Sequence, residues 1–356
     1  MITSQQVSRI LDANANRARE GLRTAEDYAR FLLGDLRHAE QLRGLRQSLT
    51  EVAKATPGMS EEGVAARNVA GDPFEPEHWK DVLRRVERET PLDVAQRGLK
   101  RAQEALRVLE EFTRGEAPQS AEIFAKLRYS VYDVEQWLVC ASPSMQIVQS
   151  ARVYVLLTAT LCRNCNVFAT SEAVLKGGVK LIQLREKHGN DVQLLHDLRR
   201  LNSLCRDYGA LVCCNDRLDL ALLAGCHMVH FGQGDLTPED ARKIAGQRLI
   251  IGRSTHSVEQ AQCAINVESA HYIAIGSMFE TRTKAEPILA GLKLAEQVAA
   301  LKLSTPVFAI GGITFDRLGA LKSAGVKRVA VSQAIIGSAD PEGEARKFVE
   351  AMATIS

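Results

Sequence analysis

The sequence predicts an α/β protein, a (β/α)8 barrel of the TIM type with an additional all-α N-terminal domain. Helical periodicity without strand-like runs fills residues 1–145, short apolar runs begin near residue 153, and an amphipathic helical pattern follows each run. Apolar strands joined by helices pair in parallel with both faces covered, and eight of them suit a closed barrel. A doubly wound open sheet is the alternative, which the count of eight and the lack of an early GxGxxG motif disfavour.

Length and composition limit the class of protein. The chain has 356 residues, enough for two domains, with 25% charged and 46% apolar residues. A net charge of +2 gives no reason to expect nucleic-acid or membrane binding. No apolar run reaches the roughly 18 residues of a membrane span, and the opening MITSQQVSRI does not resemble a signal peptide. A cytoplasmic protein is therefore expected, with its eight cysteines reduced.

The helical part contains an internal repeat. RAREGLRTAEDYAR (17–30) aligns with RAQEALRVLEEFTR (101–114), and LRQSLTEV (45–52) aligns with LRYSVYDV (127–134). We interpret these as two related helical hairpins packed in one bundle. The Pro- and Gly-containing segment between them, which begins TPGMSEEG, is expected to be a connecting loop.

The repeated Arg and Glu residues have two interpretations. They can pair along the helix surface at i, i+3 and i+4, or they can form a functional surface such as a subunit interface or an anion site. The sequence therefore predicts no definite task for this domain, and a homo-oligomer stays possible. CASPSMQIVQSA (140–151) is a plausible linker. We place the domain boundary within this linker, with a helical domain over 1–145 and a barrel over 146–356.

The barrel strands follow in order along the second domain. The eight apolar runs are VYVLLT (153–158), KLIQLRE (180–186), LVCCN (211–215), HMVHFG (227–232), LIIGRS (249–254), HYIAIG (271–276), PVFAIGG (306–312) and RVAVS (328–332). In this fold the active site lies where the carboxyl ends of the strands meet. Polar residues after these runs are therefore the candidates for function.

The second run ends in QLREK. Because side chains alternate along a strand, Gln183, Arg185 and Lys187 share one face, and Leu184 and Glu186 take the other. An amide, a guanidinium and an ammonium on one face predict an anion site.

Two carboxylates follow the next two strands. Asp216 comes directly after the third run and Asp235 a few residues after the fourth. Mg²⁺ prefers oxygen ligands, commonly one or two carboxylates with substrate phosphate oxygens. The alternative is that Asp216 caps the following helix and Asp235 caps a turn. Arg185, Lys187 and Lys284 add three cations to this rim. Together with a metal they carry more positive charge than a single phosphate needs, so we expect a diphosphate ligand.

A second phosphate site is predicted on the opposite side of the rim. The glycines of AIGGIT let the backbone approach an oxyanion, and phosphate sites after the last two strands recur in this fold.

Six motifs make the resemblance to a known family specific. GGVKLIQLREK, NDRLDLAL, VHFGQGDL, IIGRSTHSVEQA, TRTK and AIGGIT resemble, in order and spacing, those of thiamine-phosphate synthases. The helical half is similar to the extension of some bacterial members. The resemblance implies condensation of 4-amino-2-methyl-5-pyrimidinylmethyl diphosphate with 4-methyl-5-(2-phosphoethyl)thiazole or its carboxylated form. Mg²⁺-assisted, dissociative loss of diphosphate would give thiamine phosphate.

The resemblance also implies roles for particular residues. Asp216 and Asp235 would hold Mg²⁺, and Arg185, Lys187, Ser254 and Lys284 would serve in catalysis. The pyrimidine diphosphate would contact Gln183, Leu184, Arg185, Glu186, Lys187, Asn215, Ser254 and Lys284. The thiazole phosphate would meet Thr281, Thr283, Gly312 and Ser332. The chain departs from the family pattern at Glu280, Ser277 and Gln333, so the assignment of Ser332 is the weakest.

Two rival functions stay open, together with a separate zinc or redox role for one cysteine pair. The related thiazole tautomerase has a similar barrel with a histidine in a segment like that of His256, whereas His230 and His271 lie within strand runs and are expected to be structural. A non-catalytic sensor of thiamine precursors is another possibility. Cys162 and Cys165 form a CxxC that could bind zinc or exchange a disulfide, although no second CxxC accompanies it.

Overall fold

In the computed structural model, residues 4–59, 90–187, 190–280 and 289–353 are described. The chain divides into two compact units, Met1–Val139 and Cys140–Ser356. The boundary expected at residue 145 falls inside helix α7 (Ser142–Ser150), which belongs to the second unit. Within the described residues, no helix combines the length and the apolar character needed to cross a membrane.

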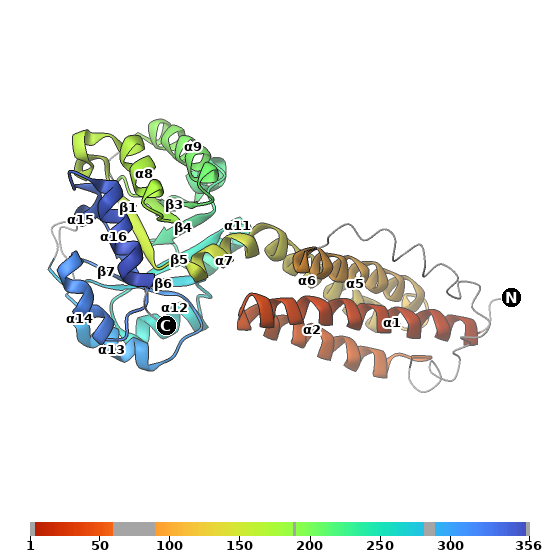
Figure 1. Ribbon diagram of the computed structural model, residues 1–356. Helices are drawn as coiled ribbons and strands as arrows, with labels where there is room; N and C mark the ends of the chain where they lie inside the picture. Colours follow the sequence, from red (N-terminus) through yellow and green to blue (C-terminus); the bar gives the residue numbers. More distant parts are fainter. Residues whose placement is uncertain (1–3, 60–89, 188–189, 281–288, 354–356) are drawn as a thin grey trace. The chain divides into compact units, whose positions relative to one another are not determined.

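The first unit is helical, as predicted. Its long helices are α1 (Ser4–Asp27), α2 (Leu36–Ala55), α5 (Pro91–Thr113) and α6 (Pro118–Cys140), with a π-helical turn, η1 (Tyr28–Leu32), after α1. Figure 1 shows the four long helices lying lengthwise beside one another. Helix α5 begins at a capping box, in which Thr90 and Asp93 satisfy each other's backbone N–H groups.

A glycine contact brings α1 against α5. A Cβ atom at Gly21 would lie 2.2 Å from the Gly98 carbonyl oxygen, and one at Gly98 would lie 2.8 Å from the Gly21 oxygen. Only the absence of a side chain at both positions allows the two helix backbones to approach this closely. The helix pair therefore depends on these two glycines.

The repeat has the same ion pair in both copies. Glu26 is buried and accepts from Arg46 Nε at 2.7 Å, while Glu110 is buried and accepts from Arg128 Nη2 at 2.9 Å. The two glutamates correspond in the first repeat match and the two arginines in the second. Arg107 also pairs with Glu110 along the helix. The repeated charges therefore join the two helices of each hairpin as well as pairing along one helix.

The second unit is a closed barrel of eight parallel strands in sequential order, with β1 paired to both β2 and β8. This confirms the predicted fold. The strands are β1 (Val153–Leu157), β2 (Leu181–Leu184), β3 (Leu211–Asn215), β4 (Met228–Phe231), β5 (Ile250–Thr255), β6 (Tyr272–Gly276), β7 (Val307–Ile310) and β8 (Val329–Val331).

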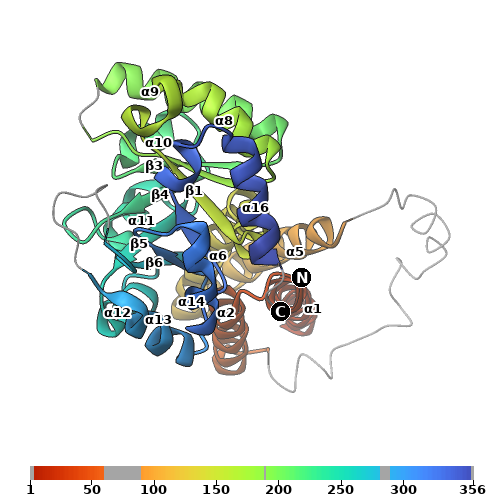
Figure 2. The same ribbon diagram turned by 60° about the vertical axis from the view of Figure 1, so that its left-hand side comes forward.

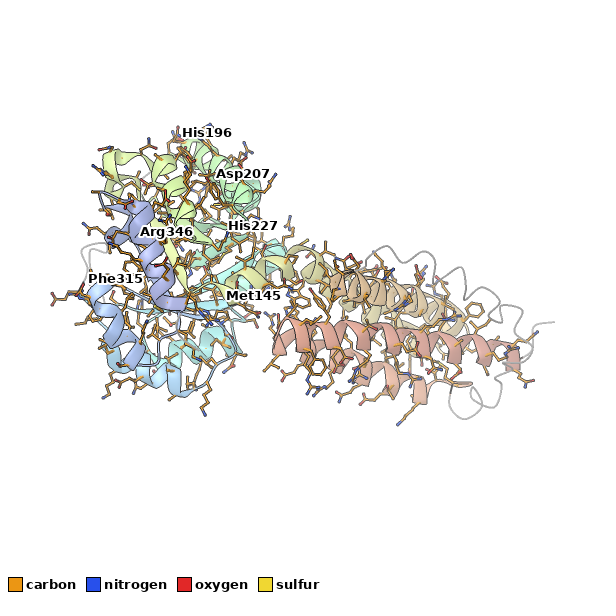
Figure 3. All side chains as sticks on the ribbon, viewed as in Figure 1. Met145, His196, Asp207, His227, Phe315 and Arg346 are labelled. Carbon is orange, nitrogen blue, oxygen red and sulfur yellow. The ribbon has the colours of Figure 1, made fainter. Side chains whose placement is uncertain are left out.

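Helices surround the strands, as Figures 1 and 2 show. They are α8 (Val167–Lys176), α9 (Asp191–Asp207), α10 (Leu218–Leu223), α11 (Pro238–Ala245), α12 (Val258–Asn266), α13 (Gly291–Ala300), α14 (Leu318–Ser323), α15 (Gln333–Ile336) and α16 (Pro341–Ala353). Short 3₁₀ turns, η2 (Ala159–Leu161), η3 (Arg163–Cys165) and η4 (Phe315–Arg317), follow β1 and β7. Polar residues of α9 such as His196 and Asp207 lie on the outer side of this layer (Figure 3).

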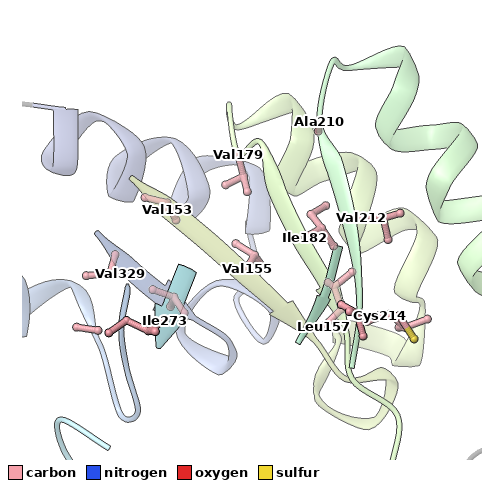
Figure 4. Packing of buried hydrophobic residues seen from close by; sticks show 14 of the residues in the cluster. Val153, Val155, Leu157, Val179, Ile182, Ala210, Val212, Cys214, Ile273 and Val329 are labelled. Atoms are coloured by element: carbon pink, nitrogen blue, oxygen red, sulfur yellow. The ribbon is translucent and has the colours of Figure 1, made fainter. Parts of the chain in front are cut away.

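The core lies between the strands and the helices. Alternate strand residues, including Val153, Val155 and Leu157 of β1, belong to one buried apolar cluster with the helices (Figure 4). The intervening residues face the barrel interior, where Tyr154, Tyr272 and Phe308 pack edge to face. These three rings are almost completely buried. They fill the interior beneath the carboxyl ends of the strands.

Candidate functional site

A cavity of about 900 Å³ lies at the carboxyl ends of the strands, and each of the eight strands or the segment after it contributes to its wall. Nine of the residues proposed from sequence line it: Gln183, Arg185, Lys187, Asn215, Asp216, Asp235, Ser254, Gly312 and Ser332. Thr281, Thr283 and Lys284 lie outside the described residues.

Strand β2 supplies the cationic part of the wall. Gln183, Arg185 and Lys187 line the cavity, as the alternation of the strand predicts. Leu184 instead belongs to the apolar core, and the Glu186 carboxylate accepts from the Ala159 N–H at 2.5 Å. These two side chains are not among the residues that line the cavity.

The acidic pair sits beside the cations. Burial and the neighbouring Asp235 carboxylate raise the pKa of Asp216 to about 6, while Lys187 opposes this shift. Asn215 Nδ2 donates to Asp216 Oδ2 at 2.6 Å. The backbone of Asp216 is left-handed, with φ of 60°, and the N-cap position of α10 is Arg217. Asp216 is therefore not the helix cap considered as an alternative, and its carboxylate is available to the cavity.

Asp235 is held in a short loop after β4. Its Oδ2 accepts from the Gly232 N–H at 2.8 Å, so the capped turn considered as an alternative is present. Arg253, buried on β5, donates from Nη1 to the carbonyl oxygens of Gly232 and Leu236, at 2.6 and 3.1 Å. Its Nε lies 3.1 Å from Glu268 Oε2. Arg253 therefore holds both ends of the loop that contains Asp235 through hydrogen bonds.

Ser254 is the end of a buried polar chain. His230 Nε2 lies 2.9 Å from Ser254 Oγ, and His230 Nδ1 lies 3.1 Å from the Tyr272 hydroxyl. That hydroxyl lies 3.2 Å from the Tyr154 hydroxyl, which accepts from Gln183 Nε2 at 2.8 Å. This hydrogen-bond network connects the two cavity residues Gln183 and Ser254 through Tyr154 and His230, which also line the cavity. It restricts the orientations of both polar groups.

Two glycines shape the opposite side of the cavity. Gly311 and Gly312 have φ of 101° and 61°, and a Cβ at Gly312 would lie 2.3 Å from the Glu280 carbonyl oxygen. Ser332 also lines this side, and its buried Oγ has no hydrogen-bond partner among the described residues. The glycine pair and Ser332 thus border the part of the cavity where a phosphate is predicted.

Some cavity-lining residues were not predicted from the sequence. His230 was expected to be structural, yet it lines the cavity and contacts Ser254. Strand alternation could have revealed it, because Val229 and Phe231 on either side belong to the outer core. Arg317 was also missed, and its position in a 3₁₀ turn after β7 gives no comparable pattern. His256, which the sequence had already indicated through the tautomerase alternative, lines the cavity too, and its Nδ1 lies 2.5 Å from the Gly276 carbonyl oxygen.

The two cysteines of the CxxC motif differ in exposure. Cys162 is buried and Cys165 is exposed, and all eight cysteines are free thiols. Burial raises the pKa of Cys162 to about 11, so this thiol is poorly suited to metal binding or exchange at neutral pH. Within the described part of the chain, no three His, Cys, Asp or Glu residues gather as a metal centre.

Fold and cavity together define a (β/α)8-barrel enzyme whose site suits anionic small molecules. The family model described as thiamine monophosphate synthase matches residues 153–335, and a model described as the ThiD2 family matches residues 9–137. A thiamine-phosphate synthase of Prochlorococcus marinus is 36% identical over 99% of this chain and 98% of that protein. One of Synechocystis sp. is 40% identical over 94% of this chain and 93% of that protein.

A solved structure agrees with these relatives. The thiamine phosphate pyrophosphorylase from Pyrococcus furiosus matches with a TM-score of 0.53 and 29% identity, over 59% of this chain and 98% of that chain. The chain belongs to the thiamine-phosphate synthase family, which confirms the resemblance found in the sequence. It is thus a transferase of thiamine biosynthesis.

Proposed function

We propose that the enzyme joins 4-amino-2-methyl-5-pyrimidinylmethyl diphosphate to 4-methyl-5-(2-phosphoethyl)thiazole, or its carboxylated form, and releases thiamine phosphate and diphosphate. One observation carries the proposal: Arg185 and Lys187 line the same cavity as the neighbouring carboxylates Asp216 and Asp235. A set of cations beside two carboxylates suits a diphosphate bound with a divalent cation, and exceeds what a single phosphate needs.

The carboxylate pair fits Mg²⁺. Its members come from neighbouring strand ends, and the proximity of Asp235 is one cause of the raised Asp216 pKa. A site in which two oxygen donors repel each other gains from a divalent cation. Bound there, Mg²⁺ would supply charge neutralisation for the diphosphate oxygens.

Bond breaking comes first in the proposed reaction. The bond between the pyrimidine methylene carbon and the diphosphate oxygen breaks, and its electron pair leaves with the diphosphate. Arg185 and Lys187 stabilise the negative charge that develops on the leaving group. Lys284, outside the described residues, is proposed to act with them. The thiazole nitrogen then donates its lone pair to the methylene cation and forms the new C–N bond.

The cavity floor supports this sequence of events. Tyr154, Tyr272 and Phe308 close the barrel beneath the site and exclude water that could capture the cation. Gln183 donates its amide N–H to Tyr154, so its Oε1 can accept from the amino group of the pyrimidine. Capture by the thiazole needs no strong base, which agrees with a cavity rich in cations.

The thiazole phosphate is proposed to bind at the other side of the cavity, at Gly312 and Ser332, with Thr281 and Thr283. Leu184 and Glu186 keep the strand and its neighbouring loop in place and make no direct ligand contact in this account. Residues 146–356 are proposed to carry the whole synthase activity. The Pyrococcus furiosus relative supports this, since 98% of it aligns with only 59% of this chain.

The test is formation of thiamine phosphate from the two purified substrates, with and without Mg²⁺. We expect turnover that requires Mg²⁺ and releases one diphosphate for each thiamine phosphate. A tautomerase would rearrange a thiazole carboxylate without using the pyrimidine, and a sensor would bind ligands without turnover. Either result would refute the proposal. Arg248→Gln, altered at an arginine outside the cavity, is the matched control and should turn over normally.

A further inference from the structure

Arg317 is a cation of the cavity wall that has no role in the proposed reaction. It ends the turn η4, lines the cavity, and is half-buried. The structure records no ion pair between it and any acid of the described residues. A positive charge in a partly enclosed wall, without a recorded ion pair to a described acid, suits an anionic ligand.

Two contacts fix the guanidinium of Arg317. Its Nη1 donates to the Gly312 carbonyl oxygen at 2.6 Å, and its Cζ lies 4.7 Å from the centre of the Phe279 ring. The cation lies over the face of the ring, a favourable cation–π arrangement. The bond to Gly312 uses one of five N–H groups, and places the cation next to the glycine pair that borders the predicted phosphate site.

The distribution of charge around the cavity separates Arg317 from the other cations. Arg185 and Lys187 lie after β2, on the side of the acidic pair. After β7 and β8, the described cavity-lining residues include one cationic side chain, Arg317. A phosphate monoester carries about −1.5 to −2 charges at pH 7. Backbone N–H groups and the Ser332 hydroxyl are dipoles, which leave that charge without a counter-ion.

We propose that Arg317 binds the phosphate of the thiazole substrate and makes the enzyme selective for the phosphorylated thiazole over the corresponding alcohol. The assignment rests on the proposed function and adds a residue and a specificity to it. Guanidinium groups bind phosphate oxygens through two parallel N–H donors. The remaining N–H groups of Arg317 and the Oγ of Ser332, which has no partner among the described residues, would bind the same phosphate.

The decisive experiment compares two co-substrates in two variants. Arg317→Gln keeps an N–H donor for the Gly312 carbonyl and removes the charge. Arg317→Lys keeps the charge but lacks the two parallel N–H donors of the guanidinium. A hydrogen bond to a charged group contributes about 1.5–3 kcal/mol, or roughly 10- to 150-fold. We expect Arg317→Gln to raise KM for the thiazole phosphate by about that factor. KM for the pyrimidine diphosphate, and kcat/KM with the thiazole alcohol, should stay within about twofold. Arg317→Lys should recover part of the loss.

A binding measurement separates this inference from the proposed reaction. Calorimetric titration of the thiazole phosphate into wild type, Arg317→Gln and the control Arg248→Gln requires no turnover. Weaker binding in Arg317→Gln alone supports the inference even if the wild type forms no thiamine phosphate. Equal binding in all three proteins, or equal loss of kcat/KM with the phosphate and the alcohol, would overturn it.

Discussion

Replacing Asp216 with Asn should stabilise the metal-free barrel and at the same time abolish turnover. Asp216 is the residue at φ of 60°, a conformation that Asn tolerates better than most side chains. The change therefore removes the charge with little backbone strain. In the wild type, Asn215 Nδ2 donates to the Asp216 carboxylate. An asparagine at position 216 keeps an acceptor oxygen for this donor.

The size of the effect follows from the pKa. Folding raises the pKa of Asp216 from 3.8 to about 6, because burial and Asp235 both disfavour its ionised form. Each pKa unit corresponds to about 1.4 kcal/mol, so the full shift would cost roughly 3 kcal/mol. Because Asp216 is only half-buried, solvent screening reduces this to about 1–2 kcal/mol.

Because folding raises the pKa of Asp216, the ionised carboxylate destabilises the folded protein only above a certain pH. Between pH 3.8 and about 6 the folded protein keeps a proton that the unfolded chain loses, so stability falls as the pH rises. The penalty is absent near pH 3 and complete above pH 7. Asp216→Asn should therefore match the wild type at low pH and exceed its free energy of unfolding by about 1–2 kcal/mol at pH 7.5.

The assay is urea unfolding of the barrel in EDTA across this pH range, repeated with saturating Mg²⁺. Mg²⁺ should stabilise the wild type and leave the variant unchanged. Asp191→Asn is the control, because Arg217 lowers the pKa of that exposed carboxyl and its loss should not stabilise the protein. No gain at pH 7.5, or equal stabilisation of wild type and Asp216→Asn by Mg²⁺, would refute the reasoning.

Three further predictions concern neighbouring interactions. Arg253→Lys should loosen the loop that carries Asp235 and weaken Mn²⁺ binding about 10-fold, because mutating the outer partners of metal ligands typically lowers metal affinity. Electron paramagnetic resonance measures this affinity, and an unchanged value would contradict the role of the loop. Tyr272→Phe removes the hydroxyl that links Tyr154 to His230 and Ser254, so it should lower kcat about 10-fold without changing KM for the thiazole phosphate. An unchanged kcat would argue against a role for this hydrogen-bond network. Glu110→Gln should destabilise the helical unit by about 1–2 kcal/mol, because the half-buried Arg128 loses its carboxylate partner and keeps the Tyr132 hydroxyl. A normal thermal midpoint by circular dichroism would exclude this.

Much of the fold could be predicted from the sequence because its periodicities are strong. Eight apolar runs became eight strands, and the alternation in QLREK correctly separated the cavity side of β2 from its core side. Strand order then brought Asp216 to the same rim as Lys187, since carboxyl ends of parallel strands meet there.

Features that depend on tertiary contacts could not be predicted in this way. The contact of Arg317 with Gly312 and Phe279 depends on how a turn folds back over the barrel, which has no period in the sequence. The capping alternative for Asp216 was excluded only by its left-handed backbone. The repeated charges predicted pairing along one helix, and their helical spacing gave no sign that Glu26 would also be buried against Arg46 of the second helix in its hairpin.

The proposed reaction requires cations and a metal to converge on a departing diphosphate. A crystal structure of the enzyme with pyrophosphate and Mg²⁺ would show whether they do. We expect the anion in contact with Arg185 and Lys187, and the metal between that anion and the carboxylates of Asp216 and Asp235. Pyrophosphate bound away from these four side chains, or bound there without metal at the two carboxylates, would contradict it.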